Sequence, residues 1–218
     1  MCSVSGGILF SEENIARPPW TETTMPPSPY CTIGPFFPGR YVDGCSDLTS
    51  FKGRRARGQH ILLTGRVVEE GNVPTRNTVL EIWQADANGV FRHPLDPRSP
   101  EIDPGFLGWG RALTDAGGRY RFLTVLPGAY KGDNGSLRCP HINVMVLAIG
   151  LTRRLVTTIF FGDAPDAVDD PVLNSIPEAS ARRRLFPARD PALDSKGVAA
   201  YRFDLVLRGA NETPFFLD

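Results

Sequence analysis

Residues 138–150 read RCPHINVMVLAIG, and this stretch decides the fold class. From His141 onward the residues are mostly apolar and β-branched, which is typical of a strand buried in a sheet. Side chains two residues apart on a strand share a face, so His141 and Asn143 should point the same way. A histidine at 143 would give a two-point grip on a metal ion, but the chain has asparagine there. The stretch therefore predicts a buried strand and raises the question of a lost ligand.

Further strands are expected on both sides of this one. In TVLEIWQAD, from residue 78, Val79, Glu81 and Trp83 should share one face, with Leu80 and Ile82 on the other. Other strand-like runs, separated by Gly, Pro and Asn turn signals, are HILLTGRVVEE, RALTDAGGRYRFLTVLPGAY, RLVTTIFFGD and AAYRFDLVLRG. Only PEASARRRLF, residues 177–186, favours a helix. The pattern predicts an all-β protein: a β-sandwich of mostly antiparallel strands with long loops and few short helices.

The first sixty residues differ in composition from the rest. The stretch ARPPWTETTMPPSPY is too rich in proline for a regular helix or a central strand. We therefore expect two regions, an extended N-terminal arm over residues 1–58 and a sandwich core over residues 59–218. A disordered tail is the alternative for residues 1–24.

Charge and cysteine usage exclude several classes of function. The 218 residues carry 24 Lys and Arg against 24 Asp and Glu, so no nucleic-acid or membrane-surface partner is indicated. No apolar run approaches the roughly 20 residues of a membrane helix, and the N-terminus lacks a secretion signal. The cysteines show no metal-binding spacing, so we expect free thiols and a cytoplasmic location. They are Cys2, Cys31, Cys45 and Cys139.

Several motifs together resemble the intradiol ring-cleavage dioxygenases, and most of all the α subunits of their protocatechuate-cleaving members. They are HILLTGRV, LEIWQADANG, LTDAGGRYRFLTVLPGAY, PHIN, IFFGD, DPVLNSI and AYRFDLVLRG. From about residue 60 onward they follow one another as in the family. The N-terminal arm matches the family only at TIGPF, residues 32–36. The resemblance implies a β-sandwich and oxidative opening of a catechol ring between its two hydroxyl-bearing carbons.

Catalytic members of the family hold one ferric iron with two tyrosines and two histidines, donors that suit Fe(III). Carried over to this sequence, those positions are Phe91, Tyr130, His141 and Asn143. Two of the four ligands are therefore missing, and the resemblance implies a vestigial site with no metal and no catalytic residue in this chain. Tyr130 and His141 are then expected to be packed and hydrogen-bonded, and Arg138 to serve a salt bridge or a subunit contact.

In the family, an α chain lines the active site of a homologous catalytic β chain, which carries the Fe(III), and the αβ pairs assemble further. The corresponding lining residues here are Thr32, Gly34, Pro35 and Phe36. The resemblance thus implies a β-subunit partner, a catecholic substrate and O₂. From the residues alone, TIGPFFPG reads as a tight turn.

One departure bears on the substrate. Family α chains place an arginine eight residues after the PHIN histidine, where it helps to receive the substrate carboxylate, and this chain has Ile149. Arg153 and Arg154 are close in sequence and offer a replacement charge. Without it, the resemblance implies a catechol with a different substituent.

Two alternatives are left open. The chain is a homomeric iron dioxygenase with unusual ligands, against which Phe91 and Asn143 count. Or it is a non-enzymatic β-sandwich binding module, with Trp83, Phe106 and Trp109 as an exposed aromatic platform. The order of LEIWQADANG and PHIN argues against the module, and a tryptophan on a strand is more often part of a core.

Overall fold

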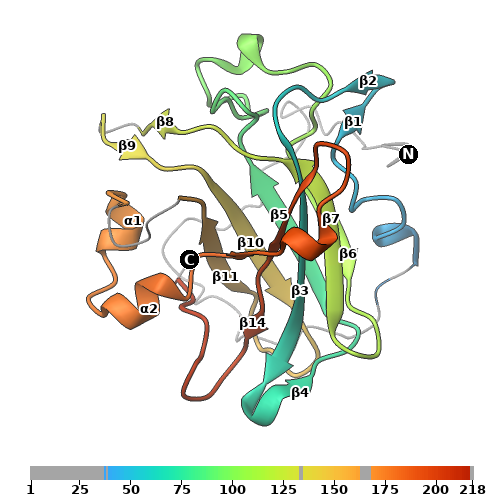
Figure 1. Ribbon diagram of the computed structural model, residues 1–218, viewed down its shortest axis with the longest axis vertical. Helices are drawn as coiled ribbons and strands as arrows, with labels where there is room; N and C mark the ends of the chain where they lie inside the picture. Colours follow the sequence, from blue (N-terminus) through green and yellow to red (C-terminus); the bar gives the residue numbers. More distant parts are fainter. Residues whose placement is uncertain (1–36, 38, 133–134, 163–167, 217–218) are drawn as a thin grey trace, which may run out of the picture.

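Two β-sheets packed face to face form the molecule (Figure 1). The computed structural model describes residues 37, 39–132, 135–162 and 168–216. The fold is all-β, as predicted, and the two α-helices are short. Within the described ranges, no helix has the length and apolar character needed to span a membrane.

The first sheet contains the strand predicted from residues 138–150. Its order is β11–β10–β5–β6, and all of its pairings are antiparallel. The strands are β10 (His141–Leu147), β11 (Leu155–Phe160), β5 (Val79–Gln84) and β6 (Trp109–Leu113). The predicted alternation holds, because Leu80 and Ile82 face the core while Trp83 faces outward. The register sets Asn143 between Trp83 on β5 and Thr158 on β11.

The second sheet is organised around β3 (His60–Glu69). β7 (Arg119–Val125) pairs antiparallel along one edge, and β13 (Ala199–Arg202) and β14 (Leu205–Val206) pair parallel along the other. β12 (Ala188–Arg189) and β4 (Val73–Pro74) complete it, so the sheets are mostly, not entirely, antiparallel. A Cβ at Gly65 would lie 1.8 Å from the Phe203 carbonyl oxygen, so only glycine fits where β13 gives way to β14.

The core lies between the two sheets. β3 contributes Ile61 and Leu63, and β10 contributes Ile142, Val144 and Val146 from alternate positions, all at most 2% exposed. Burial of such side chains supplies most of the stabilisation of a sandwich, at about 1.5–3 kcal/mol each.

Short elements decorate the sandwich. The helices are α1 (Pro171–Asn174) and α2 (Ala179–Arg183), and α2 confirms the helix expected in residues 177–186. The short strands are β1 (Ser50–Phe51), β2 (Arg54–Arg55), β8 (Tyr130–Lys131) and β9 (Leu137–Arg138). The 3₁₀ turns are η2 (Gly39–Tyr41), η3 (Glu70–Asn72), η4 (Ser99–Glu101) and η6 (Pro191–Leu193).

Residues before the expected start of the core also pack into it. Leu48 and Ala56 are buried in the cluster between the sheets, and the backbone N–H of Leu48 donates to the carbonyl of Leu123 at 2.7 Å. Of the arm expected over residues 1–58, residues 1–36 lie outside the described residues.

The expectation of free thiols is wrong for one cysteine. Cys139 is free, but Cys45 is disulfide-bonded. Spacing along the chain does not reveal which cysteines meet in a fold, so this bond could not be predicted from the sequence.

Candidate functional site

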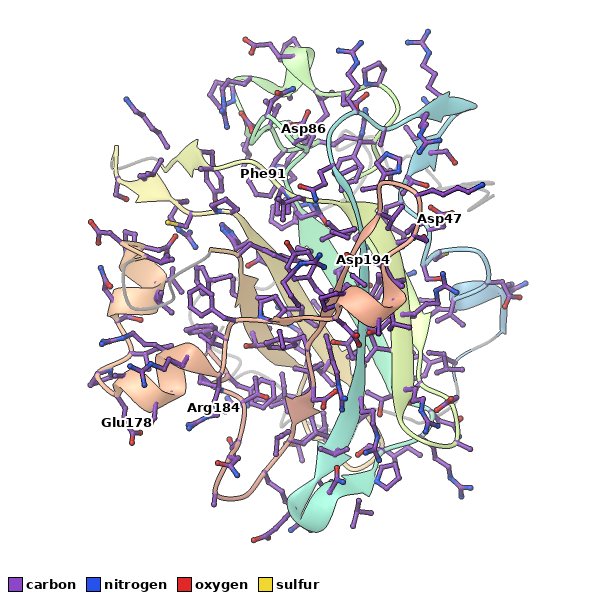
Figure 2. All side chains as sticks on the ribbon, in the orientation of Figure 1. Asp47, Asp86, Phe91, Glu178, Arg184 and Asp194 are labelled. Atoms are coloured by element: carbon purple, nitrogen blue, oxygen red, sulfur yellow. The ribbon has the colours of Figure 1, made fainter. Side chains whose placement is uncertain are left out.

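Three of the four positions expected from a metal site meet at one end of the sandwich. Phe91 follows β5, Tyr130 lies in β8, and His141 opens β10. The ring centroids of Phe91 and Tyr130 are 5.1 Å apart with planes at 88°, and those of Tyr130 and His141 are 5.6 Å apart. Figure 2 shows Phe91 at this end of the molecule, beside Asp86. The fold therefore brings together positions that are up to fifty residues apart in the chain. We call Phe91, Tyr130 and His141 the ring cluster.

The loop that carries Phe91 is held by a buried carboxylate. Asp86 accepts hydrogen bonds from the backbone N–H groups of Asn88 at 2.8 Å, Val90 at 3.0 Å and Asp103 at 3.0 Å. These bonds compensate for burying the charge and fix the loop's path. Asp86 was not predicted as a site residue, although an aspartate that opens the turn after a strand is a recognisable signal.

Further rings enclose the cluster. Trp83 lies 4.8 Å from Phe91, and Phe160 lies 5.8 Å from His141, measured between ring centroids. Phe160 in turn contacts Phe186 at 6.0 Å. The surroundings of the cluster are thus largely aromatic and apolar.

His141 is a buried histidine with a satisfied hydrogen bond. Its side chain is 3% exposed, and Nδ1 lies 2.6 Å from the carbonyl oxygen of Cys139. A carbonyl only accepts, so Nδ1 carries the proton in this contact. Burial lowers the pKa of His141 below its usual range, and the nearby Arg138 guanidinium acts in the same direction. At neutral pH the imidazole is therefore uncharged.

Arg138 forms the salt bridge that was one of the two roles expected of it. Its Nε donates to Oδ2 of the fully buried Asp170 at 2.9 Å. Asp170 also accepts from the backbone N–H of Cys139 at 2.9 Å and caps α1 through the N–H of Val172 at 2.9 Å. One carboxylate therefore ties β9, the start of β10 and α1 together next to the ring cluster.

Asn143 lies two residues along the same face of β10 from His141. Its Oδ1 accepts a hydrogen bond from the Thr158 hydroxyl at 3.1 Å, across the β10–β11 pair. The amide oxygen thus already has a protein partner in the neighbouring strand.

The donor atoms at these positions do not fit a ferric centre with four protein ligands. Phe91 has no donor atom, and Asn143 offers an amide oxygen already hydrogen-bonded to Thr158. Of the four positions, two carry a donor that suits ferric iron: Tyr130 with its phenol oxygen and His141 with an imidazole nitrogen. Within the described residues, no group of three or more His, Cys, Asp or Glu side chains is placed to hold a metal ion.

The other predicted site residues lie elsewhere. Thr32, Gly34, Pro35 and Phe36 are outside the described residues. Ile149 sits in the β10–β11 hairpin and is 50% exposed, with Arg153 and Arg154 exposed in the same hairpin. β10 runs extended from His141 to Leu147, about 20 Å at roughly 3.3 Å per residue, and Ile149 lies in the turn beyond its far end. Ile149 therefore cannot line a pocket at this chain's own ring cluster.

The three-residue aromatic platform of the binding-module alternative is wrong. Phe106 is fully buried in the core, so it cannot offer a ring to a ligand. Trp83 is 40% exposed on the outer face of β5, which also corrects the expectation that it belongs to the core. Trp109 is its cross-strand neighbour on β6, stacked against the guanidinium of Arg111 at 4.2 Å.

Comparison with known proteins gives consistent matches. A family model described as a dioxygenase matches residues 33–209. The chain is 43% identical over 173 residues to the protocatechuate 3,4-dioxygenase beta chain of Burkholderia cepacia, covering 77% of this chain and 73% of that protein. It is 34% identical over 205 residues to the alpha chain from the same organism, covering 89% and 98%.

A solved structure shares the architecture. An intradiol ring-cleavage dioxygenase from Tetranychus urticae matches with a TM-score of 0.55 and 21% identity, over 82% of this chain and 93% of that one. At this level of identity the match supports the common fold and no more.

Proposed function

We propose that this chain, which belongs to the intradiol ring-cleavage dioxygenase family, is a non-catalytic α-type subunit of a heteromeric, protocatechuate 3,4-dioxygenase-like enzyme. The observation that carries the proposal is the donor set: Phe91 and Asn143 replace two of the four iron ligands, at a place where the fold has kept the others together. A homologous β-type partner holds the Fe(III) and performs ring opening with O₂. In this view αβ pairs assemble further, in the cytoplasm.

The contribution of this chain to catalysis is then to line the partner's pocket. Thr32, Gly34, Pro35 and Phe36 form one part of that wall, and Ile149 forms another. Two observations support the role of Ile149: it is half exposed in a hairpin, and it lies far from its own chain's ring cluster. An apolar side chain at this position suits a catechol whose substituent is not a carboxylate, unless Arg153 or Arg154 supplies the charge.

Iron analysis tests the proposal directly. The chain should be purified alone and together with a β-type partner, and both preparations analysed for bound metal and visible absorption. We expect little or no iron in the chain alone and one iron for each αβ pair. Stoichiometric ferric iron with a tyrosinate-to-iron band in the chain alone would contradict the proposal.

A substitution in the hairpin tests the pocket-lining role. Ile149→Arg should raise kcat/KM for protocatechuate by about one to two powers of ten, because a charge-assisted contact to a carboxylate contributes about 1.5–3 kcal/mol. The rate with unsubstituted catechol should change little. Equal effects on both substrates, or none on either, would mean that residue 149 does not face the pocket.

A second candidate is an iron-bearing, homomeric dioxygenase with unusual ligands. The 43% identity to a beta chain favours it, since it exceeds the 34% identity to an alpha chain of the same organism. The two candidates differ in what the chain does alone. A homomer would turn over a catechol without any partner, and an α-type subunit would not.

A further inference from the structure

A groove on a different part of the molecule is rich in arginine. It has a volume of about 950 Å³ and is lined by β3, β6, β7, the end of β13 and the η6 turn. β6 and β7 run side by side (Figure 1), and both strands contribute residues to the lining of the groove. None of Phe91, Tyr130, His141 or Asn143 lines it. Its volume lies within the range typical of small-molecule sites, about 300–1,000 Å³.

Arginines outnumber aspartates among the residues that line the groove. Five arginines and three aspartates line it; they are Arg66, Arg111, Arg119, Arg121, Arg202, Asp43, Asp115 and Asp190. Three of the arginines have carboxylate partners: Arg111 with Glu81 at 2.6 Å, Arg202 with Asp204 at 2.7 Å, and Arg119 with Asp115 at 4.0 Å.

The other two arginines lack such a partner. The Arg66 guanidinium donates to two neutral oxygens, the Gly117 carbonyl at 3.2 Å and the Asn72 side-chain oxygen at 3.3 Å. Arg121 is exposed and makes no hydrogen bond or ion pair with any described residue. Arg66 and Arg121 are therefore the two guanidinium groups of the lining without a carboxylate partner among the described residues.

The sheet register forces these charges together. Arg66 on β3 is directly opposite Arg119 on β7, and Thr64 is directly opposite Arg121. Because side chains alternate along a strand, all four point to the same face. Directly opposed like charges are destabilising, and diagonal neighbours are only about 7 Å apart. A bound anion with two negative groups would relieve this repulsion.

The rest of the lining suits a carbon skeleton between two charges. The Thr64 and Ser46 hydroxyls offer hydrogen bonds, and Leu113 and Leu193 present exposed apolar surface at the rim. Guanidinium groups bind carboxylates through paired N–H donors.

We propose that this groove binds a short organic dicarboxylate, held by Arg66 and Arg121 at its two ends. Opening a catechol between its hydroxyl-bearing carbons adds both atoms of O₂ and turns those carbons into two carboxylates. The ring-opened product thus belongs to the class of ligand that the groove fits. This last identification rests on the proposed function, whereas the preference for paired carboxylates rests on the arginines alone.

Isothermal titration of the full chain, as purified, tests the proposal with matched ligands. Adipate and hexanoate have six carbons each and differ in the second carboxylate, and cis,cis-muconate represents a ring-opened product. We expect adipate and muconate to bind at least about tenfold more tightly than hexanoate. Equal binding of adipate and hexanoate, tighter binding of inorganic phosphate than of either dicarboxylate, or no binding of either dicarboxylate would overturn the proposal.

Two substitutions locate the site. Arg121→Gln removes a guanidinium that has no partner among the described residues, so folding should be preserved, and dicarboxylate affinity should fall about tenfold. Arg76→Gln is the matched control, an exposed arginine in the turn before β5 and outside the groove, and should leave affinity unchanged. Equal affinities of the two variants would place the ligand elsewhere. Iron content of the same preparations reports separately on the proposed function.

Discussion

The ring cluster and the arginine groove are opposite kinds of site on one scaffold. In the ring cluster, Tyr130 contacts both Phe91 and His141, and beside it the Asp170 carboxylate accepts hydrogen bonds from Arg138 and from the backbone N–H of Cys139. In the groove, Arg66 and Arg121 have no carboxylate partner among the described residues. The polar groups of and beside the ring cluster are hydrogen-bonded within the protein, whereas two guanidinium groups of the groove have no carboxylate partner among the described residues.

Restoring the two missing ligands should produce the largest change, in the iron content of the chain. Phe91→Tyr combined with Asn143→His would supply the two missing donors, one in the ring cluster and one two residues along β10 from His141. We expect the double variant to bind close to one ferric ion per chain, where the parent chain binds little, since the remaining geometry is in place. Metal analysis and the tyrosinate-to-iron band report the change.

Each single variant serves as the control, because three ligands should hold iron weakly. A double variant that folds but takes up no iron would show that the restored donors are not placed to bind one metal ion together.

Removing the carboxylate beside the ring cluster should have the next largest effect. Asp170→Ala leaves Arg138 without its partner and α1 without its cap, and loss of one member of a buried pair costs about 3–5 kcal/mol. Because Arg138 is partly exposed, we expect the lower end, about 3 kcal/mol in the free energy of unfolding. Urea denaturation measures it.

The exposed pair Arg189–Asp194 is the control, since Asp194→Ala should lower the free energy of unfolding by much less than Asp170→Ala does. Equal losses in the two variants would mean that the Arg138 pair is no more stabilising than a surface pair.

Acid should weaken the ring cluster through His141. The folded-state pKa of His141 is lowered by burial, so the unfolded chain takes up the proton first as the pH falls. The stabilisation is therefore complete above the ordinary histidine pKa of about 6.5 and declines as the pH falls below it. Thermal melts between about pH 7.5 and 5 should show this decline, and His141→Gln should reduce it. An unchanged slope in the variant would assign the acid sensitivity to other groups.

Removing a charged side chain from the groove should raise the free energy of unfolding, whereas Asp170→Ala should lower it. Without ligand, Arg121→Gln removes like-charge repulsion on the β3–β7 face and should raise the free energy of unfolding by a few tenths of a kcal/mol. Added salt should shrink the difference, because it screens exposed charges. A loss of stability at low salt would show that Arg121 has a structural role.

Strand pattern predicted most of the fold, because alternation reports directly which face is buried. β3, β5, β10 and β11 lie where the sequence placed them, with Ile142 and Val144 in the core. Helix α1 was missed, since four residues carry no periodicity and its signal is the single capping residue Asp170. Trp83 was assigned to the core by residue type, but its position in the alternation puts it outside.

The sites were predictable to unequal degrees. The ring cluster followed from a family resemblance, which maps ligands onto residues one by one. The groove could not be foreseen, because Arg66 and Arg119 become neighbours through the β3–β7 register and not through sequence. The disulfide of Cys45 could not be foreseen either, because spacing along the chain does not reveal which cysteines meet in a fold.

The position of β3 has a consequence for how the chain folds during synthesis. One edge of β3 is filled by β13 and β14, and the contact between Arg66 and Asp204 joins residues 138 apart in sequence. Until residues near 200 leave the ribosome, that edge presents free backbone groups to any other strand, including one from a neighbouring nascent chain. Such distant pairing also makes folding slow. Completion of the sandwich therefore depends on β13 and β14, which are synthesised late. The yield of folded protein in a cell then depends on whether the unpaired edge of β3 is protected until they arrive.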